Sequence, residues 1–112
     1  MLTIDALKEL GADTDAGLVR CLNNEEFYLK LVKMAIDDGK YEKLREDITA
    51  GSLDDAFEAA HALKGMLGNV SLDNLLEPVT AITEGLRAKE SLDYGALLDQ
   101  MEEELKKLRA LF

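Results

Sequence analysis

Apolar residues recur at intervals of three and four along most of the chain, which is the spacing of one buried face of an α-helix. No segment alternates apolar and polar residues in the way that a half-buried strand does. The pattern therefore predicts an all-α protein. The predicted helices span residues 2–10, 13–22, 25–50, 53–70 and 72–89, with a last helix from 92 to the end of the chain.

The stripes also predict which side chains are buried. In the last two helices the stripes are Leu72, Leu75, Val79, Ile82 and Leu86, then Tyr94, Leu98, Met101, Leu105, Leu108 and Phe112. The 53–70 helix should bury Leu53, Ala56, Ala60, Leu63, Leu67 and Val70. The 25–50 stretch should bury Phe27, Leu31 and Met34 in its first half and Tyr41, Leu44 and Ile48 in its second.

Polar residues mark where helices begin and end. Asn24 precedes the 25–50 stretch, Ser91 precedes the last helix, and Ser52 with Asp55 resembles a capping box before residue 53. Residues 37–39 (Asp-Asp-Gly) interrupt the 25–50 pattern, which predicts one helix kinked there and leaves two helices open.

Turns of one to three residues between long amphipathic helices force neighbouring helices to run antiparallel. We therefore expect an up-down-up-down antiparallel four-helix bundle with one or two short N-terminal helices. The chain should form a single domain over residues 1–112. Residues 1–23 would provide the short helices and residues 24–112 the bundle.

Composition narrows the possible functions. Apolar residues make up 47% of the 112 residues, but only 5% are aromatic, which favours a core of small aliphatic side chains. The net charge of −10 disfavours nucleic acid and anionic membranes as partners. Cys21 is the only cysteine and is expected to be a buried apolar residue, so neither a disulfide nor a metal site is predicted. No apolar run reaches the roughly 18 residues that span a membrane, and no signal peptide is evident, so we expect a cytoplasmic protein. No apolar excess supports a homodimer, so we expect a monomer.

His61 is the only histidine, and it lies beside the apolar stripe of the 53–70 helix. A lone histidine in such a position is commonly structural. Here, however, Gly65 and Gly68 follow on the same helical face, although each glycine costs roughly 1 kcal/mol in a helix interior. Both leave the surface around the imidazole bare, and Lys64 places a positive charge one turn away. Glu58, one turn before His61, is a candidate to accept a ring N–H.

The run His61-Ala62-Leu63-Lys64-Gly65 resembles the H-x-[LI]-K-G signature of histidine-containing phosphotransfer (HPt) domains, the phosphoryl carriers of multistep phosphorelays. The resemblance extends from about Phe27 to the C-terminus. It implies that His61 takes a phosphoryl group, that Lys64 neutralises the phosphoryl oxygens, and that Gly65 and Gly68 leave room for a receiver domain. Ser71 stands where the family often has a glycine.

The resemblance also implies the function. The protein would accept a phosphoryl group from a phospho-aspartyl receiver domain of a hybrid histidine kinase and pass it to an aspartate of a response regulator. No nucleotide-binding loop is present, so the protein is expected to be a carrier without kinase activity and without a cofactor. The alternative is a non-catalytic helical adaptor that signals only by binding its partners.

Overall fold

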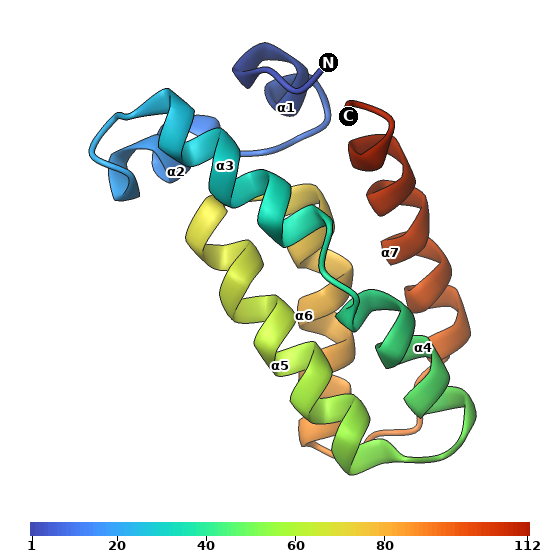
Figure 1. Ribbon diagram of the computed structural model, residues 1–112. Helices are drawn as coiled ribbons and strands as arrows, with labels where there is room; N and C mark the ends of the chain where they lie inside the picture. The colour runs from blue at the N-terminus through green and yellow to red at the C-terminus, as the bar shows by residue number, and fades with distance from the viewer.

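The computed structural model describes all residues, 1–112, and contains only helices, which confirms the predicted all-α class (Figure 1). The molecule is elongated, with extents of 40 × 24 × 19 Å. None of its helices combines the length and the apolar character needed to cross a lipid bilayer. The helices are α1 (Ile4–Glu9), α2 (Thr14–Arg20), α3 (Glu25–Ile36), α4 (Lys40–Thr49), α5 (Leu53–Val70), α6 (Asp73–Arg87) and α7 (Tyr94–Arg109).

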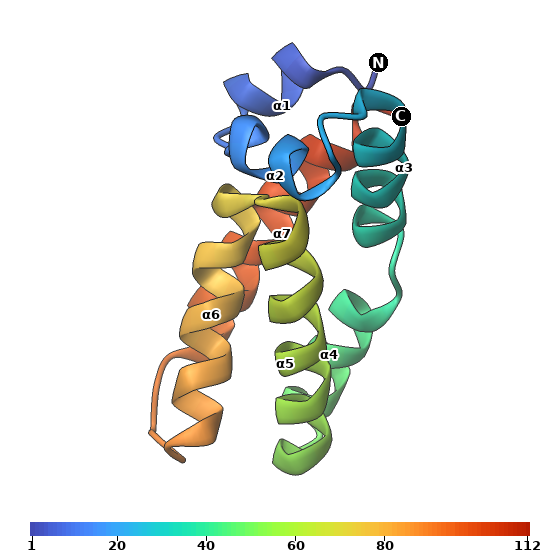
Figure 2. The same ribbon diagram turned by 90° about the vertical axis from the view of Figure 1, so that its left-hand side faces the viewer.

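Helix α5 packs against both α4 and α6, and α6 packs in turn against α7. Figures 1 and 2 show these four helices running along the length of the molecule, while α1 and α2 lie across the end at which both termini are found. Helix α2 contacts α5, and α3 contacts both α5 and α7. The short N-terminal helices thus cover the end of the molecule at which α5 terminates and α6 begins.

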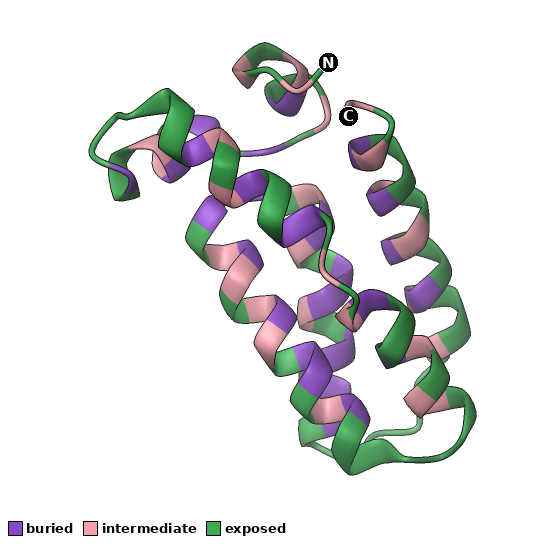
Figure 3. Ribbon diagram, in the orientation of Figure 1, coloured by how far each residue is buried: buried purple, intermediate pink, exposed green.

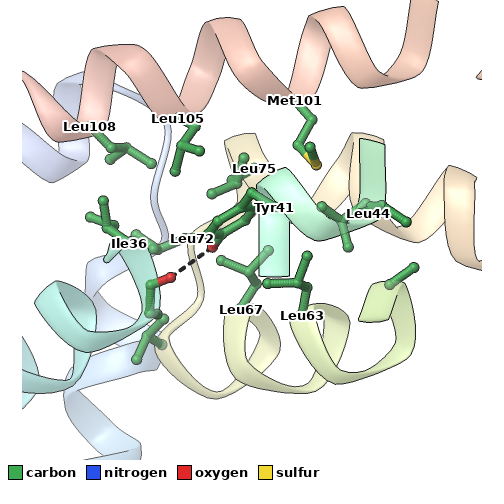
Figure 4. Packing of buried hydrophobic residues seen from close by; sticks show 14 of the residues in the cluster. Ile36, Tyr41, Leu44, Leu63, Leu67, Leu72, Leu75, Met101, Leu105 and Leu108 are labelled. Carbon is green, nitrogen blue, oxygen red and sulfur yellow. Dashed lines mark hydrogen bonds between the residues drawn. The ribbon is translucent and has the colours of Figure 1, made fainter. Parts of the chain in front are cut away.

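A single cluster of 24 buried apolar residues fills the space between the helices. The buried positions face inward along α5, α6 and α7 in Figure 3, and leucine side chains from several helices meet in Figure 4. The cluster includes Cys21, which is a free and buried cysteine as predicted. Leucine is the commonest residue of the cluster, so aliphatic side chains from different helices supply most of the buried surface.

The 25–50 stretch forms two helices, α3 and α4, separated at residues 37–39, and not the single kinked helix that the pattern favoured. The Asp38 side chain accepts the first backbone N–H of α4 at 2.7 Å and so begins a new helix. Arg109 of α7 donates to the Ile36 carbonyl at 3.2 and 3.1 Å, which satisfies an acceptor at the end of α3. The Tyr41 hydroxyl donates to the Ala35 carbonyl at 2.8 Å and bridges the break (Figure 4).

The predicted buried face of α3 was wrong. Phe27 is 47% exposed and Met34 is 60% exposed, and Leu31 is only partly buried. The reason is that α3 is a separate helix, so its orientation is not tied to that of α4. The Tyr28 hydroxyl instead donates to the Val70 carbonyl at 2.8 Å and turns the neighbouring face inward. The side chains buried on α3 are Tyr28, Val32, Ala35 and Ile36.

The other stripes agree with the structure except near helix ends. All five predicted α6 residues are buried, and so are five of the six predicted for α5. Ile48 and Tyr94 are only partly buried, and Leu53 and Phe112 are each 50% exposed. Leu53 opens α5 and Phe112 follows α7, so neither has a neighbouring helix to cover it.

The predicted caps were partly correct. Asn24 accepts the Phe27 N–H at 3.0 Å and begins α3, as expected. Ser52 precedes α5 but makes no capping hydrogen bond with its side chain, so the capping box does not form. Ser91 does not cap α7. Asp93 accepts the Ala96 N–H at 3.0 Å instead, because the helix begins two residues later than the pattern suggested.

Ser71 ends α5 in the left-handed conformation, with φ 54° and ψ 41°. Glycine adopts this conformation more easily than other residues. This explains why the family often has a glycine where this chain has Ser71. The serine adds a contact that glycine cannot make, because its hydroxyl accepts a hydrogen bond from Arg20 at 2.5 Å. Its carbonyl also accepts the Asp13 N–H at 2.9 Å. The turn between α5 and α6 is thereby fastened to α2.

Candidate functional site

Helix α5 presents His61 on the outside of the molecule. Ala60 and Leu63 lie on the opposite side of the same turn and are fully buried, which fixes the orientation of this part of the helix. His61 itself is exposed, and its ring makes no hydrogen bond with another protein group. The expected hydrogen bond from His61 to Glu58 is not formed. The imidazole is therefore held by its position on a rigid helix, with both ring nitrogens free to react or to bind.

The neighbour that orients the imidazole is aromatic. The rings of Phe57 and His61 stack with centroids 5.6 Å apart and an interplanar angle of 13°. The two residues are four positions apart, which brings their side chains together on one face of α5. The guanidinium carbon of Arg87, on α6, lies 5.1 Å from the centroid of the Phe57 ring, within the range of a cation–π contact. Phe57 thus lies in contact with both the imidazole and a cation from α6.

Lys64, one turn after His61, is held by a carboxylate of the neighbouring helix. Its Nζ lies 2.8 Å from Oε1 of Glu84 on α6. The hydrogen bond from Lys64 holds the pKa of Glu84 below its usual value, and nearby Arg87 acts in the same direction. The other carboxylate oxygen, Oε2, lies 3.3 Å from Nε of Arg87. One carboxylate therefore pairs with two cations beside the histidine.

The two glycines of α5 leave the helix surface beside them open. A methyl group placed on Gly65 or on Gly68 would have no heavy atom within 4 Å outside its own stretch of helix. Neither glycine has a positive φ, so neither is needed for the shape of the helix backbone. Two residues that weaken a helix are thus retained at positions where the local packing does not require them.

An open groove of about 1090 Å³ begins at Phe57 and continues toward the end of α6. It lies between the start of α5, the end of α6 and the segment that leads into α7. Arg87, Lys89 and Glu90 line part of it and give it a mixed charge. Its apolar lining consists of Ile48, Leu53, Phe57, Leu86, Leu92 and Tyr94.

Three residues around His61 were not predicted from the sequence, because their contacts form only in the folded protein. The position of Phe57 one turn before His61 was visible in the sequence, but its stacking was not. Glu84 and Arg87 lie on α6, and only the antiparallel register of α5 and α6 brings them to the histidine.

No group of three or more His, Cys, Asp or Glu side chains is arranged to hold a metal ion.

Comparison with known families identifies the class of protein. The family model described as Hpt domain matches residues 38–111, which include α4 to α7 and the whole site. The chain belongs to the Hpt domain family. No curated protein and no solved structure matched the chain. Hpt domains carry out histidine phosphotransfer in phosphorelays; they are carriers and not kinases, and they interact with receiver domains of response regulators or hybrid kinases.

Proposed function

We propose that this protein is a phosphorelay intermediate with His61 as its phosphoacceptor. It takes a phosphoryl group from a phospho-aspartyl receiver domain and passes it to an aspartate of a response regulator. The observation that carries this proposal is that the only histidine lies exposed in the middle of α5, within the span that matches the Hpt family.

The chemistry needs little more than this arrangement. The unprotonated ring nitrogen of His61 attacks phosphorus, the P–O bond to the receiver aspartate breaks, and the carboxylate leaves with the electron pair. A P–N bond forms, and the reverse reaction delivers the phosphoryl group to the next aspartate. Imidazole is partly neutral and nucleophilic near pH 7. Phosphoryl transfer depends mainly on positioning and charge neutralisation. Phe57, which stacks on the imidazole, positions the ring, and Lys64, on the other side of His61, neutralises charge on the phosphoryl oxygens.

Gly65 and Gly68 serve the approach of the partner in this proposal. In-line transfer requires that the receiver aspartate come within contact distance of the imidazole. The surface one and two turns beyond His61 carries no side chain at these two positions, so the receiver backbone can pack directly on α5.

The architecture that carries the site is part of the same proposal. Helices α4 to α7, with α3 continuing the line of α4, serve as an up-down-up-down bundle, and the contacts between successive helices support this arrangement. The shared apolar cluster supports a single domain over the whole chain, with the first two helices as a cap on one end.

Transfer from a phosphorylated receiver domain tests the proposal, with wild type compared to His61→Gln. We expect label on the wild type and none on the variant, with matching circular dichroism spectra because His61 is exposed. Lys64→Ala should retain labelling at a reduced rate. A receiver that binds wild type and His61→Gln equally, with no transfer to either, would support the adaptor and overturn the carrier.

A further inference from the structure

Two cations close to His61 along the helices, Lys64 and Arg87, are both paired with one carboxylate of α6. Glu84 accepts from Lys64 at 2.8 Å through Oε1 and from Arg87 at 3.3 Å through Oε2. Lys64 lies one helical turn from His61, and Arg87 lies against Phe57, the ring on which His61 stacks. Without a phosphoryl group, Glu84 is therefore the counter-ion of the positive charge around the imidazole.

A phosphoryl group on His61 would bring between one and two negative charges to this surface and would compete with Glu84 for the same cations. Lys64 has a flexible stem and a compact ammonium group, so it can leave Glu84 for a phosphoryl oxygen within a turn of helix. When it does so, the carboxylate loses a partner and remains close to the new negative charge. The lost ion pair and the repulsion between the carboxylate and the phosphoryl group both make phosphorylated His61 less stable.

We propose that Glu84 is a positioning residue that keeps the phosphoryl group on His61 transferable, because it competes for Lys64 and Arg87 and disfavours the phosphohistidine. This inference rests on the proposed role of His61 as phosphoacceptor. A carrier must be able to give up the phosphoryl group as well as accept it, and Glu84 lowers the stability of the loaded state.

The test compares Glu84→Gln with wild type, using two phosphoryl donors. The first is a phosphorylated receiver domain, from which the equilibrium constant for transfer to His61 is measured. The second is phosphoramidate, whose P–N bond breaks and releases ammonia as the new P–N bond forms on His61. Phosphoramidate needs no docking surface, so it reports on the charges around the imidazole alone.

We expect Glu84→Gln to raise both the equilibrium constant and the initial rate of labelling by phosphoramidate by about two- to fivefold, the range that an exposed ion pair supports. The effect should shrink in a Lys64→Met background, because Glu84 acts largely through Lys64. Glu77→Gln is the matched control, since Glu77 is exposed on α6 seven residues earlier and forms no ion pair. It should change neither quantity.

The outcomes separate this inference from the proposed function. If the receiver labels wild type and Glu84→Gln to the same extent, or if the substitution lowers the equilibrium constant, Glu84 does not oppose the phosphohistidine and the inference is wrong. If phosphoramidate labels His61 and the rate rises in Glu84→Gln, but no receiver transfers to wild type, the inference holds and the phosphorelay role fails. Absence of label from both donors overturns both.

Discussion

Alanine in place of Gly65 is expected to stabilise the protein and, at the same time, to slow phosphoryl transfer from a receiver domain. Gly65 lies inside α5, four residues after His61, and a methyl group there would meet no other part of the molecule within 4 Å. The new side chain therefore causes no clash within the protein. It would, however, stand on the surface that the receiver is proposed to use.

The stability change follows from helix propensity. Glycine in a helix interior is less favourable than alanine by about 0.5–1 kcal/mol, since it loses more conformational freedom on folding. For a chain of this length that gain corresponds to a rise in melting temperature of about 2–6 °C. Thermal unfolding followed by circular dichroism measures it directly.

The transfer change follows from geometry. A methyl group on the contact surface forces the receiver away from α5, and a displacement of about 1 Å at a reacting centre can cost roughly 10²-fold in rate. We expect the rate of transfer from a phosphorylated receiver to fall at least about tenfold, while labelling by phosphoramidate stays unchanged. Gly95→Ala is the control, because Gly95 lies in α7 outside the site and a methyl group there would make only an ordinary contact, 3.4 Å from Asp93.

Two results would contradict the open surface at Gly65 or its use by the receiver. A lower melting temperature for Gly65→Ala would mean that the glycine is needed for the fold and that its surface is not open. An unchanged transfer rate in a stabilised variant would mean that the receiver does not approach α5 at this position.

Two further substitutions and one pH titration test the fold. Gly17→Ala should destabilise the protein by about 1–3 kcal/mol in denaturant unfolding, because the methyl group would overlap the Tyr28 ring; an unaltered midpoint would contradict the packing of α2. Arg109→Ala should cost about 1–3 kcal/mol, since it leaves the Ile36 carbonyl at the end of α3 without its donor; a neutral result would show that water replaces it. Burial raises the pKa of Tyr28 to about 12 and also raises the pKa of Tyr41, because the folded protein favours the neutral phenol. The two neutral phenols therefore contribute to folding stability below pH 10, and this contribution is lost as the pH rises through about 12. Absorbance at 295 nm should show both phenols ionising well above pH 10 in the folded protein, and ionisation near pH 10 would contradict their burial.

The sequence predicted best where one periodic pattern ran without interruption. The stripe of α6 was correct throughout, and that of α5 failed only at Leu53, its first residue. The short α3 offered two apolar faces of similar strength. Which of them is buried was decided by a hydrogen bond from Tyr28 to Val70, 42 residues away, and no local pattern contains that information. The interruption at residues 37–39 was visible in the sequence, but the Arg109 side chain that satisfies the Ile36 carbonyl there comes from the far end of the chain.

The candidate site shows the same division. His61, Lys64, Gly65 and Gly68 share one helix, so their common face could be read from their spacing alone. The groups that complete the surroundings of His61 come from α6, and their positions depend on how far α6 is shifted along α5. Helical periodicity gives the face that each helix buries but leaves this shift undetermined. For that reason Glu84 was not recognised as the partner of Lys64 before the structure was known.

The position of the label after transfer shows whether His61 is the phosphoacceptor. Wild-type protein is phosphorylated by a receiver domain and digested, and the phosphorylated peptide is sequenced by mass spectrometry under alkaline conditions that preserve phosphohistidine. We expect one phosphorylated residue, His61, with a phosphoryl group that is lost in acid and stable in base. A label on an aspartate, glutamate or serine of this chain, or equal labelling of His61→Gln, would contradict it.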